Sequence, residues 1–211
     1  MRFFSPDSPM MQALSKLADL VVLNFLAVLC SLPVVTLGAS AAALYDAVER
    51  LMKDEGSTVR NFFRAFGSNF RKATALWLIL LALGTVGVVC MLYYGNTEMT
   101  GQGVFFVCSV LILVLWSFTV SWVFPLQAKF ENTVRGTLTN GLLCALAYLP
   151  RSLVMAVLNL LPLGLFLISL PWFVQLCLVW LGIWFSLAAA INLRLLKKPY
   201  TRMIGETQET V

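Results

Sequence analysis

The stretch ATALWLILLALGTVGVVCMLYY (Ala73–Tyr94) decides the fold of this chain. It contains no charged residue, and it is as long as the run of about 20 apolar residues that a helix needs to cross the hydrocarbon core of a bilayer. It also lacks the alternation of polar and apolar residues that is typical of a membrane β-barrel strand. The stretch therefore predicts a transmembrane α-helix.

Similar apolar stretches lie on both sides of it, and we expect further spans over residues 17–36, 104–126, 150–168 and 172–193. The mean hydropathy is +0.86 and only 12% of the 211 residues are charged, so a soluble domain of this composition could not solvate its surface. The sequence predicts one all-α domain over residues 1–211, a polytopic membrane protein with about five transmembrane helices.

Positive charge is confined to a few segments between these spans. Thirteen of the 15 Lys and Arg residues fall in three groups: Arg50, Lys53, Arg60, Arg64, Arg71 and Lys72; Lys129, Arg135 and Arg151; and Arg194, Lys197, Lys198 and Arg202. The connections at 95–103 and 169–171 contain none. Because loops rich in Lys and Arg stay in the cytoplasm, we expect a multi-pass cell-membrane protein with residues 39–72, 127–151 and the C-terminus on the cytoplasmic side.

The first span contains a break signal at its end. Pro33 lacks an amide donor and Gly38 tolerates a sharp turn, so Pro33–Gly38 should interrupt the helix, with the Thr36 hydroxyl bonding to a freed carbonyl. We expect this turn to pack inside the bundle or against a partner, because exposed backbone is costly in lipid. Five spans would place the N-terminus outside, whereas a re-entrant hairpin over Leu17–Met52 would keep it inside.

Short amphipathic segments are expected at the cytoplasmic surface. In Val59–Phe70, the pattern predicts Val59, Phe63, Phe66 and Phe70 on one face and Arg60, Arg64 and Arg71 on the other. Such a helix lies in the membrane interface or docks on a partner, and both interpretations stay open. We expect Ala39–Met52 to leave the membrane as an amphipathic helix and Asn140–Leu149 to form a second interfacial helix. Arg151 then lies at the membrane edge, where it is tolerated.

Residues that carry enzyme chemistry are scarce. The chain has no histidine, its five cysteines stand alone, and no nucleotide-binding or hydrolase motif is present. We therefore expect no enzyme activity, no metal and no cofactor. The net charge of +5 belongs to membrane edges and anionic lipid, so nucleic acid is not an expected partner. Asn24, Asn159, Gln175 and Asn192 are expected to hydrogen-bond between helices, and Asp19 to pair with Lys16.

Three motifs resemble those of one family. They are NFLAVLCSLPVVTLGAS (Asn24–Ser40), NFFRAFGSNFRKAT (Asn61–Thr74) and NTVRGTLTNGLL (Asn132–Leu143), and SLPVVTLG (Ser31–Gly38) is the most specific part. Together they resemble the YesL-like membrane proteins of Gram-positive bacteria, a family of unknown function catalogued as DUF624. The resemblance implies a membrane protein of about this length, with genes that typically lie beside those of sugar-uptake ABC transporters. It supplies no catalytic residues.

The function expected from this resemblance is an accessory or regulatory component of carbohydrate ABC uptake, with the lipid bilayer and an ABC permease as partners. An autonomous small-solute transporter or channel is the alternative, and a membrane enzyme is the least favoured reading. The candidate interaction residues are Pro33, Thr36, Gly38, Arg60, Phe63, Arg64, Phe66, Phe70 and Arg71.

Overall fold

The computed structural model describes residues 9–96 and 101–209, which contain helices and no strand. In chain order, the elements are α1 Pro9–Ser31, the 3-10 turn η1 Val34–Thr36, α2 Leu37–Met52, α3 Thr58–Gly95, α4 Gln102–Lys129, α5 Val134–Ala147, α6 Leu149–Ile168, α7 Leu170–Gln175, α8 Cys177–Val179, the π-helix η2 Trp180–Trp184 and α9 Phe185–Glu209. Within these residues, five helical segments are long and apolar enough to cross a membrane. The expected all-α membrane fold is confirmed.

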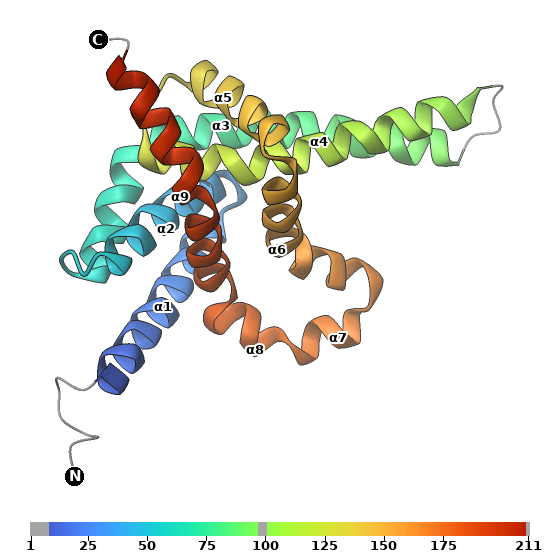
Figure 1. The fold of residues 1–211 in the computed structure, drawn as a ribbon. Coiled ribbons are helices and arrows are strands. Elements are labelled where there is room, and N and C mark those ends of the chain that lie inside the picture. The colour runs from blue at the N-terminus through green and yellow to red at the C-terminus, as the bar shows by residue number, and fades with distance from the viewer. Residues whose placement is uncertain (1–8, 97–100, 210–211) are drawn as a thin grey trace.

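Helices α3 and α4 form a long antiparallel hairpin that projects from the rest of the molecule (Figure 1). They contain the predicted spans 73–94 and 104–126. The prediction of a separate amphipathic helix over Val59–Phe70 is wrong, because this segment is continuous with the second span in one helix of 38 residues. The junction contains no proline, and its only glycine is Gly67. A single glycine does not end a helix. At 1.5 Å per residue α3 is about 57 Å long, nearly twice a hydrocarbon core of about 30 Å, so its first turns extend beyond a single span.

Helices α1 and α2 form a second hairpin. Helix α1 ends at Ser31, five residues before the predicted end at Thr36, because a residue that precedes proline disfavours the helical conformation. The Nζ atom of Lys16 lies 2.9 Å from the carboxylate of Asp54, so the beginning of α1 and the end of α2 lie at the same end of the molecule. Lys16 therefore pairs with Asp54 rather than with Asp19. A return of the chain to the end where α1 begins is what the re-entrant hairpin predicts, while α1 is itself long and apolar enough for a single crossing.

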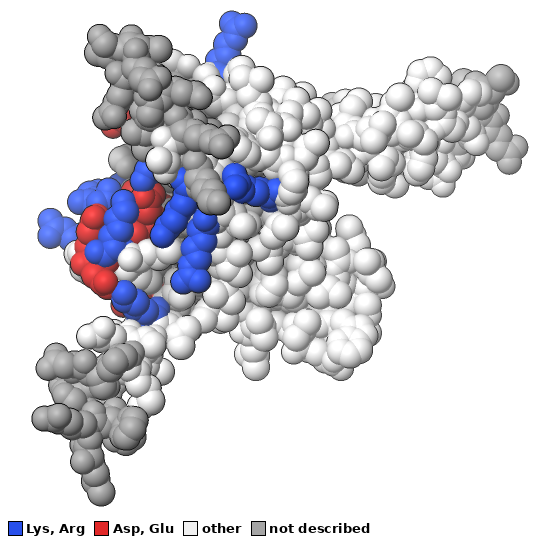
Figure 2. Space-filling model, in the orientation of Figure 1, with Lys and Arg blue, Asp and Glu red and all other residues white. Residues whose placement is uncertain are grey.

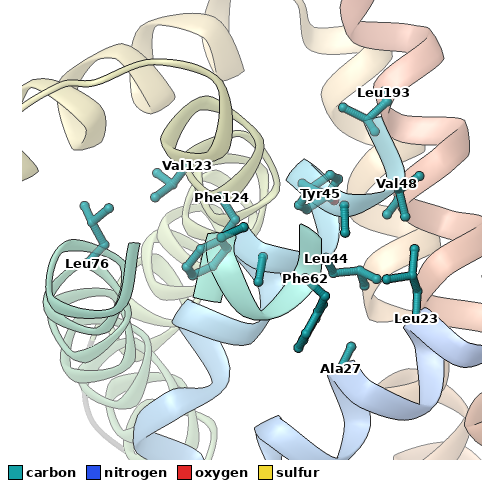
Figure 3. Close-up of a cluster of buried hydrophobic side chains, with 14 of the residues drawn as sticks. Leu23, Ala27, Leu44, Tyr45, Val48, Phe62, Leu76, Val123, Phe124 and Leu193 are labelled. Carbon is teal, nitrogen blue, oxygen red and sulfur yellow. The ribbon is translucent and has the colours of Figure 1, made fainter. Parts of the chain in front are cut away.

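Helix α2 lies at the centre of the molecule and contacts α1, α3, α4 and α9. Its Ala39, Ala42, Ala43 and Ala47 side chains are fully buried, and their small size lets four helices approach closely. The amphipathic helix predicted over Ala39–Met52 is present, with its alanines on the packing face and Asp46, Glu49 and Arg50 in ion pairs. Around it lies the main core (Figure 3), whose larger side chains come from several helices: Leu23, Tyr45, Val48, Phe62, Leu76, Val123, Phe124 and Leu193.

The C-terminal half follows the predicted order with two differences. Helix α6 matches the span expected at 150–168, and the Arg151 guanidinium lies over the Tyr148 ring, 5.3 Å from its centroid, at the beginning of that helix. Helix α5 begins at Val134, before the expected interfacial helix at Asn140, because Thr133 caps it by accepting a hydrogen bond from the Gly136 amide. The expected continuous span 172–193 is interrupted, since α7, α8 and η2 precede α9.

Candidate functional site

The SLPVVTLG turn between α1 and α2 is held by side chains that satisfy its backbone. The Thr36 hydroxyl lies 2.6 Å from the Cys30 carbonyl oxygen and 2.8 Å from that of Pro33, which confirms the role predicted for it. Trp77 on α3 donates its indole N–H to the Val34 carbonyl at 2.7 Å. These bonds supply partners for backbone groups that the break in the helix leaves free.

Gly38 is the point where this turn docks on α3. A Cβ atom at this position would lie 2.4 Å from the Ala73 carbonyl oxygen and 2.5 Å from the Trp77 Cβ, so only glycine fits without displacement of α3. The tip of the turn behaves differently, because Leu32 is 72% exposed and Val34 is 57% exposed. Gly38 therefore packs inside the bundle as predicted, whereas the exposed tip leaves the predicted contact with a partner untested.

The predicted aromatic face of α3 is divided. Phe62, which is adjacent to the predicted face in the sequence, is fully buried in the core, and Phe66 is partly buried beside it. Phe63 and Phe70 are exposed. The structure therefore places two of the expected aromatic side chains on the surface and uses the neighbouring Phe62 as the anchor.

The exposed half of this part of α3 carries cations and aromatic rings side by side. Arg60, Arg64 and Arg71 are exposed on the same half of the helix as Phe63 and Phe70. Arg64 lies 3.1 Å from the Asn61 side-chain oxygen, and none of the three arginines forms an ion pair within the described part of the chain. Figure 2 shows that charged side chains gather at one end of the molecule and are absent from the described part of the projecting α3–α4 hairpin and from the arc through α7 and α8.

A second set of polar side chains is buried, and sequence reasoning identified them only as interhelical glue. Asn24 of α1 is fully buried and bridges the π-helix: it donates to the carbonyl oxygens of Trp180 and Leu181 and accepts from the amides of Phe185 and Ser186. A π-helix breaks the regular i to i−4 pattern, and here one amide side chain replaces part of it. The signal in the sequence was an uncharged polar residue inside an apolar span.

A separate chain of hydrogen-bonded polar side chains crosses the bundle. Asn159 lies 3.1 Å from the Ser121 hydroxyl, and Asn192 lies 3.1 Å from the Asn159 oxygen and 2.9 Å from the Tyr45 hydroxyl. The Asn192 side-chain oxygen is buried and has no hydrogen-bond partner in the described residues. The chain joins α2, α4, α6 and α9 through uncharged groups, so it can bind hydroxyl or amide groups but cannot carry a titrating proton near neutral pH.

At the charged end, ion pairs connect α2, α4 and the turn after α2. Glu49 accepts from Lys53 at 2.9 Å and from Lys129, while Asp46 accepts from Arg50 at 2.8 Å. Burial raises the pKa of Glu49, but the hydrogen bonds and charges of Lys129 and Lys53 outweigh it and leave the pKa below its usual value. Glu49 is therefore ionised at neutral pH. Among the described residues, no group of three His, Cys, Asp or Glu side chains is placed to hold a metal ion.

These features define a class: a polytopic α-helical membrane protein with interrupted helices and a cationic surface at one end. Residues 20–91 match the model of a family described as "Protein of unknown function, DUF624". The DUF624 assignment that the sequence motifs suggested is therefore confirmed, and residues 20–91, from α1 through most of α3, are the part that carries it. Comparison with curated proteins and with solved structures found no match.

The matched residues include the SLPVVTLG turn, all of α2 and the α3 segment with its arginines. They exclude NTVRGTLTNGLL in α5 and the π-helix. The family motif thus coincides with the α1–α2 hairpin and the helix on which Gly38 docks.

Proposed function

We propose that this chain is an accessory membrane protein that binds a carbohydrate ABC importer and assists or regulates it, in the cell membrane of a Gram-positive bacterium. The DUF624 resemblance implies the association with sugar uptake. The observation that carries the proposal is the exposed face of Arg60, Phe63, Arg64, Phe70 and Arg71 on α3.

The arrangement of this face favours a protein partner over simple seating on lipid. A helix that lies in the membrane interface segregates its cations and aromatic rings on opposite faces. Here both kinds lie on the same exposed half, on a helix that continues directly into a span. Aromatic and Arg side chains together are enriched at protein–protein interfaces and at their energetic centres.

Co-purification from native membranes tests this proposal. We expect the tagged wild-type protein to retain the permease subunit of a carbohydrate ABC importer of the same organism. Reversal of Arg60, Arg64 and Arg71 to Glu should abolish that retention, and Phe63→Ala with Phe70→Ala should weaken it at least about tenfold, since interface anchors contribute 2 kcal/mol or more.

Arg135→Glu with Arg194→Glu is the matched control, because both arginines are exposed elsewhere at the cationic surface. This variant should retain the permease. Equal retention by the α3 variants and the control would contradict a role for the α3 face, and absence of any importer subunit from the wild-type preparation would contradict the proposed function.

An autonomous small-solute transporter or channel is the second candidate, and the interrupted helices with the uncharged polar chain favour it. Broken helices often line solute pathways in transporters, and neutral amide and hydroxyl groups suit a polyhydroxylated solute. Uptake of radiolabelled sugar by liposomes that contain only this protein, and its loss in Asn192→Leu, would support this candidate over the accessory role.

A further inference from the structure

A basic pocket lies at the charged end, between α2, α4 and α9. Its volume is about 350 Å³, and it is lined by Glu49, Met52, Lys53, Lys129, Leu193, Lys197, Tyr200 and Thr201. This volume falls in the range of small-molecule sites, about 300–1,000 Å³, and exceeds what one inorganic ion fills. The pocket is distinct from the arginine face of α3 and from the buried polar chain.

Its charges do not balance. Lys53 and Lys129 both bond to the same carboxylate oxygen of Glu49, so their ammonium groups lie close together and share one negative charge. Lys197 also lines the pocket and has no ion pair in the described part of the chain. The lining thus contains three lysines and one carboxylate, an excess of two positive charges that the exposed Glu55 near Lys53 offsets only in part.

Tyr200 adds a second observation at the same place. Its ring lines the pocket and lies 5.9 Å from the Lys129 Nζ, and it is only 7% exposed. Its hydroxyl is buried and has no hydrogen-bond partner in the described residues. Burial, together with nearby Tyr45 and Glu49, raises the pKa of this hydroxyl, so it stays a neutral donor that lacks an acceptor.

We propose that this pocket binds the phosphate group of an anionic ligand. A phosphate offers one or two negative charges and several acceptor oxygens, which match the lysine ammonium groups of the lining; the Thr201 hydroxyl already donates to the Lys197 carbonyl oxygen. The apolar Met52 and Leu193 in the lining can contact the organic part of a phosphate ester. The pocket lies at the end where the charged residues gather (Figure 2), and this end can meet both water and lipid headgroups. The phosphate therefore belongs either to a soluble phosphate ester or to a phospholipid headgroup.

Two arms separate these sources, both with the purified full chain in uncharged maltoside micelles. In the soluble arm, thermal unfolding is measured with glucose 6-phosphate or with glucose. In the lipid arm, native mass spectrometry measures retention of phosphatidylglycerol or of a diacylglycerol with the same acyl chains. We expect one phosphorylated probe to bind and its unphosphorylated counterpart not to bind.

Lys197→Gln should weaken that binding at least about tenfold, which is the loss expected for one charge-assisted hydrogen bond. Lys72→Gln, at an exposed position of α3, should leave the binding unchanged. An effect on glucose 6-phosphate assigns a soluble ligand, and an effect on phosphatidylglycerol assigns a lipid. If both probes bind the two variants equally, or neither binds the wild-type protein, the proposal is overturned. Neither arm depends on an importer, so its outcome is independent of the proposed function.

Discussion

Gly38 shows at the scale of one residue how the family motif shapes the fold. Its Cα hydrogen faces α3, and the Ala73 carbonyl and Trp77 side chain occupy the space that a Cβ would take. The neighbouring Thr36 and Trp77 bond to the carbonyls of the turn. The motif therefore combines a break in the chain, partners for the broken backbone and a close contact between α2 and α3.

We predict that Gly38→Leu destabilises the protein by about 1–3 kcal/mol or more, because overpacking against backbone atoms forces α2 away from α3. Gly67→Ala is the matched control, since Gly67 lies in α3 and no atom lies within 4 Å of its added Cβ. That change should be neutral or stabilising by up to about 1 kcal/mol through helix propensity. Thermal unfolding in detergent measures both, and equal melting temperatures for Gly38→Leu and the wild-type protein would refute the close contact.

Sequence reasoning could predict the break at Pro33 and the bond from Thr36, because both follow from local chemistry that needs no knowledge of neighbours. It could not predict that Phe62 rather than Phe63 anchors α3. The two residues are adjacent, and a helical pattern with aromatic residues at both positions does not define which side the rest of the bundle will cover. That choice depends on where α1 and α2 pack, which is tertiary information.

At the scale of elements, Asn24 joins helix α1 to the interrupted fifth span. Its side chain uses donors and acceptors on both sides of the π-helix, and all four of its bonds go to backbone groups of residues 180–186. The break could not be predicted from the apolar stretch 172–193, which reads as one continuous span. The partner that satisfies the break lies about 160 residues away in the sequence.

We predict that Asn24→Leu destabilises the packing of α1 on α9, because each buried backbone group left without a partner costs about 1–3 kcal/mol. The same change at exposed Asn140 should alter stability by less than about 0.5 kcal/mol. Hydrogen exchange of the amides of Phe185 and Ser186 provides the specific readout, and it should accelerate in Asn24→Leu. Unchanged protection of these two amides would contradict the bridging role.

The packing of α2 also depends on tertiary information that its sequence pattern does not contain. Its alternating alanines and charged residues resemble a surface amphipathic helix, and a sequence pattern alone does not distinguish a helix with a lipid-facing stripe from one with a helix-facing stripe. Ala39, Ala43 and Ala47 are completely buried, which shows that the stripe of α2 faces other helices. The spans at 73–94, 104–126 and 150–168 were predictable because length and hydropathy define them without reference to partners.

The arrangement of hairpins determines topology at the scale of the whole molecule. Helices α1 and α2 form one hairpin and α3 and α4 another, while α6 and α9 run from and back to the end where charged residues gather (Figure 1, Figure 2). The contact between Lys16 and Asp54 ties the beginning of α1 to that same end. Because cation-rich segments stay inside, both ends of the chain should be cytoplasmic.

We predict, in a cysteine-free background, that cysteines at Ser15 and Ser57 react with a membrane-impermeant maleimide only after the cells are opened. A cysteine at Gly103 should react in intact cells, since this exposed residue begins the α4 side of the hairpin tip and has no atom within 4 Å of an added Cβ. Ser57 serves as the cytoplasmic reference because it follows the ion-paired turn after α2. Reaction of Ser15→Cys in intact cells would place the N-terminus outside and restore the single crossing by residues 17–36. Reaction of Gly103→Cys only in opened cells would overturn the orientation of the entire molecule.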